Sequence, residues 1–212
     1  WMAKELGFTA HFSDMSFQDA QKAVQSGDAD VLTSFFYSKK RDEQFDFTPV
    51  MFEVPASIFV VAERTDIKAL RDLNGKTLAM QKGDYAKEYL DSSGIVFDVL
   101  YTQDFAEATD LVVSGKADAV IGDEQIVLYH IFENRLTDLI KKVGDPLYIG
   151  KNCMAVRESN PVLVGILSKG ISLARESHVL EKIHRKWIGT TYSERAPTFS
   201  RFLPHIIAAV CV

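Results

Sequence analysis

The sequence predicts an α/β protein made of two lobes joined by two crossing strands. The phrase "VQSGDADVLTS" at residues 24–34 returns 88 positions later as "VVSGKADAVIG" at 112–122. Each copy has the pattern of a helix end, a glycine stop and an apolar run typical of a buried parallel strand. Strand-like segments at 57–62 and 149–156 flank the second copy, so the chain crosses to a second lobe and returns. We therefore expect the two copies to lie in separate sheets.

The composition is that of an ordinary soluble globular protein. The chain has 212 residues, of which 47% are hydrophobic and 25% charged, and its net charge is −5. This acidic balance argues against nucleic acid or an anionic membrane surface as the main partner. Cys153 and Cys211 match no metal or disulfide spacing, and no cofactor is expected.

Each copy is expected to be preceded by a strand and a capped helix. Residues 9–13, "TAHFS", and 98–102, "DVLYT", occupy corresponding places and predict strands. Asp14 and Thr102 are 88 positions apart, and both residue types cap helix N-termini. Apolar residues then recur at helical spacing in both copies, which predicts one helix in each.

The segment between the copies supplies further elements. A strand at 57–62 follows Pro55, and Asp66 is expected to cap a short helix that ends near Asn74. The apolar run at 76–81 predicts another strand, because it is short and bounded by turn residues.

The second unit is complete, whereas the first lacks its opening strand. Gly83 is expected to open a helix at 85–93. With the same offset, the counterpart of strand 76–81 would fall before Trp1. Three segments could fill this place: an upstream segment, a strand of a partner chain, or residues 206–212 folding back. We expect the upstream segment, in a larger membrane sensor of which this chain is a fragment.

The last third of the chain is predicted to be mainly helical. Residues 145–158 predict a turn and a strand, and Asn160 followed by Pro161 predicts a helix start. Helices are expected at 162–175 and 178–189.

The apolar tail at 202–212 is shorter than the roughly 20 residues that a membrane span needs. We favour the start of a truncated membrane helix, with a buried strand as the alternative. The resulting division places lobe one at residues 1–56 plus 150–190, lobe two at 57–149 with hinge strands at its ends, and a juxtamembrane or tail segment at 191–212.

Three stretches occur in the order typical of one family: "GDADVLTSFFYSKKRDEQFDFTPVMF", "LRDLNGKTLAMQKGDYAKEYL" and "SGKADAVIGDEQIVLYHI". Over about residues 1–190 the chain resembles the bacterial extracellular solute-binding proteins of family 3, which are type II periplasmic-binding-protein or Venus flytrap domains. The last two stretches are more similar to sensor domains of histidine kinases and diguanylate cyclases. The resemblance implies a periplasmic or extracytoplasmic domain at the inner membrane, attached through flanking segments, compatible with a homodimer, and binding a small amino-acid-like ligand between its lobes without catalysis.

The resemblance also implies two charged ligand contacts. Arg41 matches the family arginine that holds the ligand carboxylate, and a guanidinium suits that role because it offers two parallel donors. Asp123 matches the family aspartate that accepts from the ligand ammonium. Taken from the residues alone, Arg41 could instead belong to a solvated basic turn with Lys39 and Lys40, and Asp123 could cap the next helix.

Further contacts are implied by the same matches. Gly83, Asp84 and Tyr85 stand where the family has a glycine followed by two hydroxyl residues that hold the carboxylate. Asp84 would repel a carboxylate, which leaves room for a cationic or amine-rich ligand. Ser34 matches a ligand-contacting position. Phe36 replaces a small polar residue, and it either stacks on the ligand or packs in the core.

Two other functions are compatible with the same fold. A transport receptor for amino acids would share the fold and the cleft. A few relatives on this fold are dehydratases of prephenate or arogenate, for which Asp84 or Glu124 could serve as the acid. We expect a binding domain, because the sequence contains no phosphate loop, zinc spacing or nucleophile motif.

Overall fold

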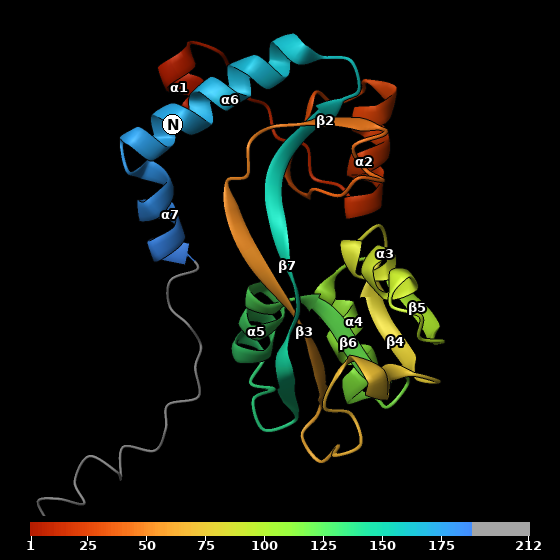
Figure 1. Ribbon diagram of the computed structural model, residues 1–212. Helices are drawn as coiled ribbons and strands as arrows, with labels where there is room; N and C mark the ends of the chain where they lie inside the picture. Colours follow the sequence, from red (N-terminus) through yellow and green to blue (C-terminus); the bar gives the residue numbers. More distant parts are fainter. Residues whose placement is uncertain (188–212) are drawn as a thin grey trace, which may run out of the picture.

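The computed structural model describes residues 1–187 (Figure 1). The predicted tail at 191–212 and the proposed strand at 206–212 lie outside the described residues. Among residues 1–187, none of the helices has both the length and the apolar character needed to cross a membrane.

Two long strands run through the middle of the molecule and connect its two halves. β3 (Phe52–Val61) and β7 (Ile140–Arg157) pair antiparallel, from Phe52 opposite Asn152 to Val61 opposite Ile140. The other strands add to this pair in the order β1-β7-β3-β6-β4-β5, with β2 also paired to β7. They are β1 (Val31–Phe36), β2 (Phe45–Phe47), β4 (Thr77–Gln81), β5 (Asp98–Thr102) and β6 (Ala119–Asp123).

The expectation of two separate sheets is therefore wrong, although the architecture is α/β as predicted. β1 and β6 belong to one hydrogen-bonded sheet, because β3 and β7 are long enough to carry the ladder from one half to the other. Each half still has its own apolar core. One lies around Phe35 under α2, and two lie on the opposite faces of the β4–β6 region, around Leu78 and Phe105.

Helices cover both halves of the sheet (Figure 1). The first half contains β1 and β2 with four helices: α1 (Met2–Leu6), α2 (Phe17–Ser26), α6 (Pro161–Glu176) and α7 (Val179–Trp187). The second half contains β4, β5 and β6 with α3 (Tyr85–Ser92), α4 (Phe105–Val113), α5 (Glu124–Glu133) and the 3-10 helix η1 (Leu70–Leu73). The helices predicted at 162–175 and 178–189 are confirmed as far as residue 187, and the Asn160 side chain accepts the cap hydrogen bond of α6.

The internal repeat is present, but its helix caps differ from those predicted. Ser16 caps α2 and Asp104 caps α4, each accepting the backbone N–H three residues further on. The expected caps, Asp14 and Thr102, lie two residues too early. Ser16 and Asp104 are still 88 positions apart, so the repeat extends to the capping position itself.

Residues 9–13 do not form the predicted strand, whereas their counterpart β5 does. β5 pairs in parallel with β4 along its whole length. In the first unit no strand corresponding to β4 is present among residues 1–187, so "TAHFS" has no ladder to join. Phe12 in this stretch is 87% exposed.

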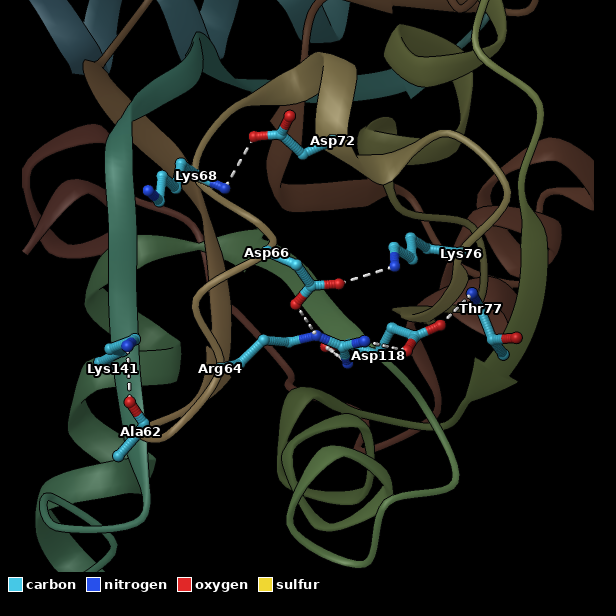
Figure 2. A network of polar contacts seen from close by, with 9 residues as sticks. All are labelled: Ala62, Arg64, Asp66, Lys68, Asp72, Lys76, Thr77, Asp118 and Lys141. Carbon is cyan, nitrogen blue, oxygen red and sulfur yellow. Dashed lines mark hydrogen bonds and ion pairs between the residues drawn. The ribbon is translucent and has the colours of Figure 1, made fainter.

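A network of ion pairs connects the turn after β3 with the residues just before β4 and β6 (Figure 2). Arg64 bonds Asp66 at 2.8 Å and Asp118 at 2.6 Å, and Lys76 bonds Asp66 at 2.8 Å. The Asp118 carboxylate also accepts the Thr77 N–H at 2.8 Å. Hydrogen bonds from these cations hold the pKa of Asp66 well below its usual value.

The predicted helix cap at Asp66 is wrong for the same reason, since its carboxylate is engaged with Arg64 and Lys76. η1 begins after Ala69, and Asp72 takes the capping role by accepting the N–H groups of Lys68 and Ala69.

Candidate functional site

Arg41 lies in the loop after β1 and reaches the other half of the molecule. Its side chain is 10% exposed. Nη1 donates to the Phe36 carbonyl and Nη2 donates to the Gly83 carbonyl, both at 2.9 Å. Its Cζ lies 4.1 Å from the centre of the Phe35 ring. Arg41 is thus a buried cation placed between the halves, and the alternative of a solvated basic turn does not describe it.

The Gly83–Tyr85 loop faces Arg41 from the carboxyl end of β4. The Asp84 carboxylate accepts the Ala86 N–H at 2.7 Å and thereby caps α3. Burial raises the pKa of Asp84, and this effect is opposed by that hydrogen bond and by Arg41. Tyr85 lies under Arg41, with the guanidinium 5.6 Å from the ring centre.

Asp123 ends β6, the strand parallel and adjacent to β4. Because neighbouring parallel strands end at the same edge of a sheet, Asp123 lies close enough to Asp84 for their charges to interact. The Asp123 side chain makes no capping hydrogen bond to α5, and its Oδ1 is buried without a partner among the described residues. Burial, followed by the charge of Asp84, raises the pKa of Asp123 to about 8, against the lowering effect of Arg41.

An aromatic cluster occupies the boundary between the halves. The Phe36 ring packs edge-on against Tyr85 and Tyr148, with ring centres 6.4 and 6.5 Å apart, and Tyr85 packs on Tyr148 at 5.1 Å. Tyr148 was not predicted as a site residue; its buried hydroxyl has no partner among residues 1–187, and burial raises its pKa. Its place in the returning strand, near Arg41 and both aspartates in space, follows only from the register of β7.

No described contact connects Ser34, another predicted site residue, to this aromatic cluster. It lies at the bulge of β1, where its hydroxyl accepts a hydrogen bond from Asn152 Nδ2 at 2.7 Å. Asn152 Oδ1 is buried and has no partner in the described part of the chain. Asn152 is therefore a second polar group that the sequence analysis did not single out.

A cavity of about 390 Å³ opens beside Arg41 and is bordered by α2 and α3. Its lining includes Gln18 and Gln21 on one side, and Gly83, Asp84 and Glu88 on the other. This volume lies in the range typical of small-molecule sites, but Asp123, Phe36 and Tyr148 are not among the residues that line it. In residues 1–187 there is no group of three or more His, Cys, Asp or Glu side chains placed to hold a metal ion.

The curled α/β sheet, the two halves joined by β3 and β7, and a polar cleft between them define the type II class of periplasmic binding proteins. The chain belongs to the bacterial extracellular solute-binding proteins, family 3, whose profile matches residues 1–190.

Curated relatives of the chain are amino-acid-binding proteins. It is 26% identical over 188 residues to the ABC transporter arginine-binding protein 1 of Escherichia coli (strain K12), covering 88% of this chain and 75% of that protein. It is 22% identical to the L-cystine-binding protein TcyA of Bacillus subtilis (strain 168), covering 91% of this chain and 71% of that protein.

Two solved structures at 30% identity share the fold closely. A histidine kinase sensor domain with similarity to periplasmic binding proteins has a TM-score of 0.82 and covers 89% of this chain and 82% of its own. An ancestral arginine-binding protein bound to glutamine has a TM-score of 0.80, with coverage of 89% and 84%. Both a sensor domain and transport-type binding proteins are thus similar to this chain.

Proposed function

We propose that this chain is an extracytoplasmic domain that binds a small amino-acid-like ligand between its lobes. Arg41 takes the ligand carboxylate, and Asp123, supported by Asp84, takes the amino group. The observation that carries the proposal is the Asp123 oxygen, which is buried without a partner among residues 1–187 and lies near a buried arginine from the opposite half. An ammonium group would supply the missing donor, since a buried carboxylate without one is costly.

The charges favour a cationic or amine-rich ligand over an acidic one. Asp84 and Asp123 lie at the strand ends, and burial raises the pKa of each. A ligand ammonium would favour the ionised form of these carboxyls, whereas an acidic ligand would not. The guanidinium of Arg41 has five N–H donors in a fixed fork. Nη1 and Nη2 each donate one hydrogen bond to a backbone carbonyl, and Nε lies 4.0 Å from a carboxylate oxygen of Glu88. Donors therefore remain for one carboxylate, while a second ligand carboxylate would face Asp84.

Calorimetry against L-arginine, L-lysine, L-glutamine, L-cystine, L-glutamate and putrescine tests this function. We expect basic amino acids to bind more tightly than L-glutamate. Arg41→Ala should weaken binding by about 2–4 kcal/mol, as for truncating one partner of a buried charge pair. Lys39→Ala is the control, because Lys39 is an exposed neighbour of Arg41 and should bind as the wild type does. Equal affinity of wild type and Arg41→Ala for every bound ligand would show the assignment to be wrong.

We further infer that the domain senses its ligand for a membrane signalling protein such as a histidine kinase, attached through flanking segments at the inner membrane. The similarity to a histidine kinase sensor domain supports this role. Lobe one (1–56 plus 150–190) would close on lobe two (57–149) when the ligand binds. A full-length gene with a membrane span followed by a kinase or cyclase domain would support sensing.

An amino-acid transport receptor is the second candidate, favoured by the similarity to the arginine-binding protein of Escherichia coli. A stop codon shortly after residue 212, in a gene next to permease genes, would favour it over the sensor role. The two candidates share the ligand site, so the calorimetric test applies to both.

A further inference from the structure

The Phe36 side chain occupies an unusual place for a residue at the end of a strand. Its ring is buried at the boundary between the halves, with 5% of the residue exposed. It lies directly over β7 at Gly150, where a Cβ built on the glycine would overlap the ring. The absence of a side chain at residue 150 is therefore what leaves room for the Phe36 ring.

The contacts of this ring cross from one half of the molecule to the other. Phe36 belongs to β1, while Tyr85 is the first residue of α3, and the two ring centres are 6.4 Å apart. Tyr148 closes the triangle from β7. Such edge-on aromatic pairs are favourable beyond the area that they bury.

Hydrogen bonds at the same boundary also hold the two halves together. The Gly83 carbonyl accepts hydrogen bonds from Arg41 Nη2 at 2.9 Å and from Gln21 Nε2 at 3.1 Å. Both donors come from the first half, and Gly83 comes from the second. The halves are thus held together through side chains of the chain itself.

We propose that Phe36 is a built-in occupant of the boundary between the lobes, which latches them together without a ligand and competes with the ligand for the space beside Tyr85 and Tyr148. The latch depends on Phe36, Tyr85, Tyr148 and the bare backbone at Gly150. Competition with a ligand rests on the proposed function, whereas the latch itself does not.

Small-angle X-ray scattering of the ligand-free protein tests the latch by two independent routes. Phe36→Ala removes the ring, and Gly150→Ala keeps the ring but forces it out of its place. Both variants should give a larger radius of gyration than the wild type, with unchanged far-ultraviolet circular dichroism. The wild type should match the scattering calculated from the structure in which Phe36 contacts Tyr85.

The chain supplies a matched control for Gly150→Ala. At Gly122 in β6 an added Cβ would overlap the Phe105 ring of α4, and both residues belong to the second half. Gly122→Ala should therefore lower the unfolding midpoint without changing the radius of gyration. If Gly122→Ala opens the protein as much as Gly150→Ala, general destabilisation explains the effect and the latch is wrong.

The double variant shows whether Gly150 acts through the ring. In the Phe36→Ala background, Gly150→Ala should cause no further increase in the radius of gyration, because the ring that it displaces is already gone. Phe36→Leu serves as the decisive variant if Phe36→Ala does not fold, since it keeps an apolar side chain but loses the edge-on contacts. A folded Phe36→Leu protein as compact as the wild type, or an open wild type, would overturn the proposal.

Titration with L-arginine tests the competition separately. If the latched state is the main ligand-free state, Phe36→Ala should bind L-arginine between about fivefold and about a hundredfold more tightly than the wild type, because apparent affinity scales with the fraction of competent protein. Equal or weaker binding by Phe36→Ala would overturn the competition. Absence of L-arginine binding in every variant, together with the scattering change, would contradict the proposed ligand class and leave the latch standing.

Discussion

At the scale of single residues, the Asp123 carboxyl should make the stability of the protein depend on pH. Its Oδ1 is buried without a partner in the described chain, and its pKa is raised to about 8. Near neutral pH the folded protein therefore holds a proton on this carboxyl that the unfolded chain, with a usual value of 3.8, has released. Burial of Asp123 therefore destabilises the folded state increasingly as the pH rises above the usual pKa, because the carboxyl must either keep its proton or be buried with its charge.

The stability of the protein should fall as the pH rises through this interval. A raised carboxyl pKa contributes no penalty below the unfolded value and its full penalty above the folded value. Asp123→Asn removes this titration, so its stability relative to wild type should improve by at least about 1 kcal/mol between pH 5 and pH 8.5. Urea denaturation at the two pH values measures the change.

Asp138→Asn is the control for this experiment, because Asp138 is an exposed aspartate outside the cleft. Its stability should change with pH in parallel with the wild type. A parallel pH dependence of Asp123→Asn and wild type would contradict the assignment of the raised pKa to Asp123.

At the scale of elements, the internal repeat places the same residue type in two different structural situations. Asp118 precedes β6, where it accepts the Thr77 N–H of β4 and pairs with Arg64. Asp30 stands 88 positions earlier, just before β1, and is exposed. No hydrogen bond or ion pair of its side chain is formed within residues 1–187. The carboxylate stabilises the sheet only where the neighbouring parallel strand is present.

This pair gives an internally controlled test of stability. Asp118→Ala should lower the free energy of unfolding by about 1–3 kcal/mol, because it leaves a backbone donor and part of a charge network unpaired. Asp30→Ala should change it by less than about 0.5 kcal/mol, as for an exposed surface position. Chemical denaturation of the two variants decides, and equal losses would contradict the role given to Asp118.

The elements that the sequence could predict are those fixed by local pattern. The apolar runs of β1, β4 and β6 and the Asn160–Pro161 helix start were predicted from nearby residues alone. Residues 9–13 have the composition of a strand but form none, because a strand also needs a paired neighbour.

The site was predictable only in part for a similar reason. The resemblance to the solute-binding family singled out Arg41, Asp84 and Asp123, each of which follows a strand. Tyr148 and Gly150 reach the cleft through the register of β7 on β1 and β3, which is a long-range property. Phe36 was recognised as a departure from the family pattern, but its packing over Gly150 could not be read from the sequence.

At the scale of the whole molecule, the β3–β7 ladder joins the first half to the rest of the sheet. In the described structure β1 and β2 pair with β7, whereas β3 pairs with both β7 and β6. Any movement of the lobes must therefore be accommodated in β3 and β7. Their ladder has a register shift between Ala56 and Ile58, close to Tyr148 opposite Ala56, which places an irregularity beside the cleft.

The dependence of β1 and β2 on β7 also has a consequence for the time course of folding. A ribosome makes residues 31–47 early, yet their ladder partners at 152–157 emerge more than a hundred residues later. By contrast, β4, β5 and β6 lie between residues 77 and 123 and can pair among themselves much sooner. Because distant pairings form slowly, the half made first should become ordered last. In refolding with pulsed amide exchange, protection at 78–81 and 119–122 should precede protection at 31–36, and the reverse order would contradict it.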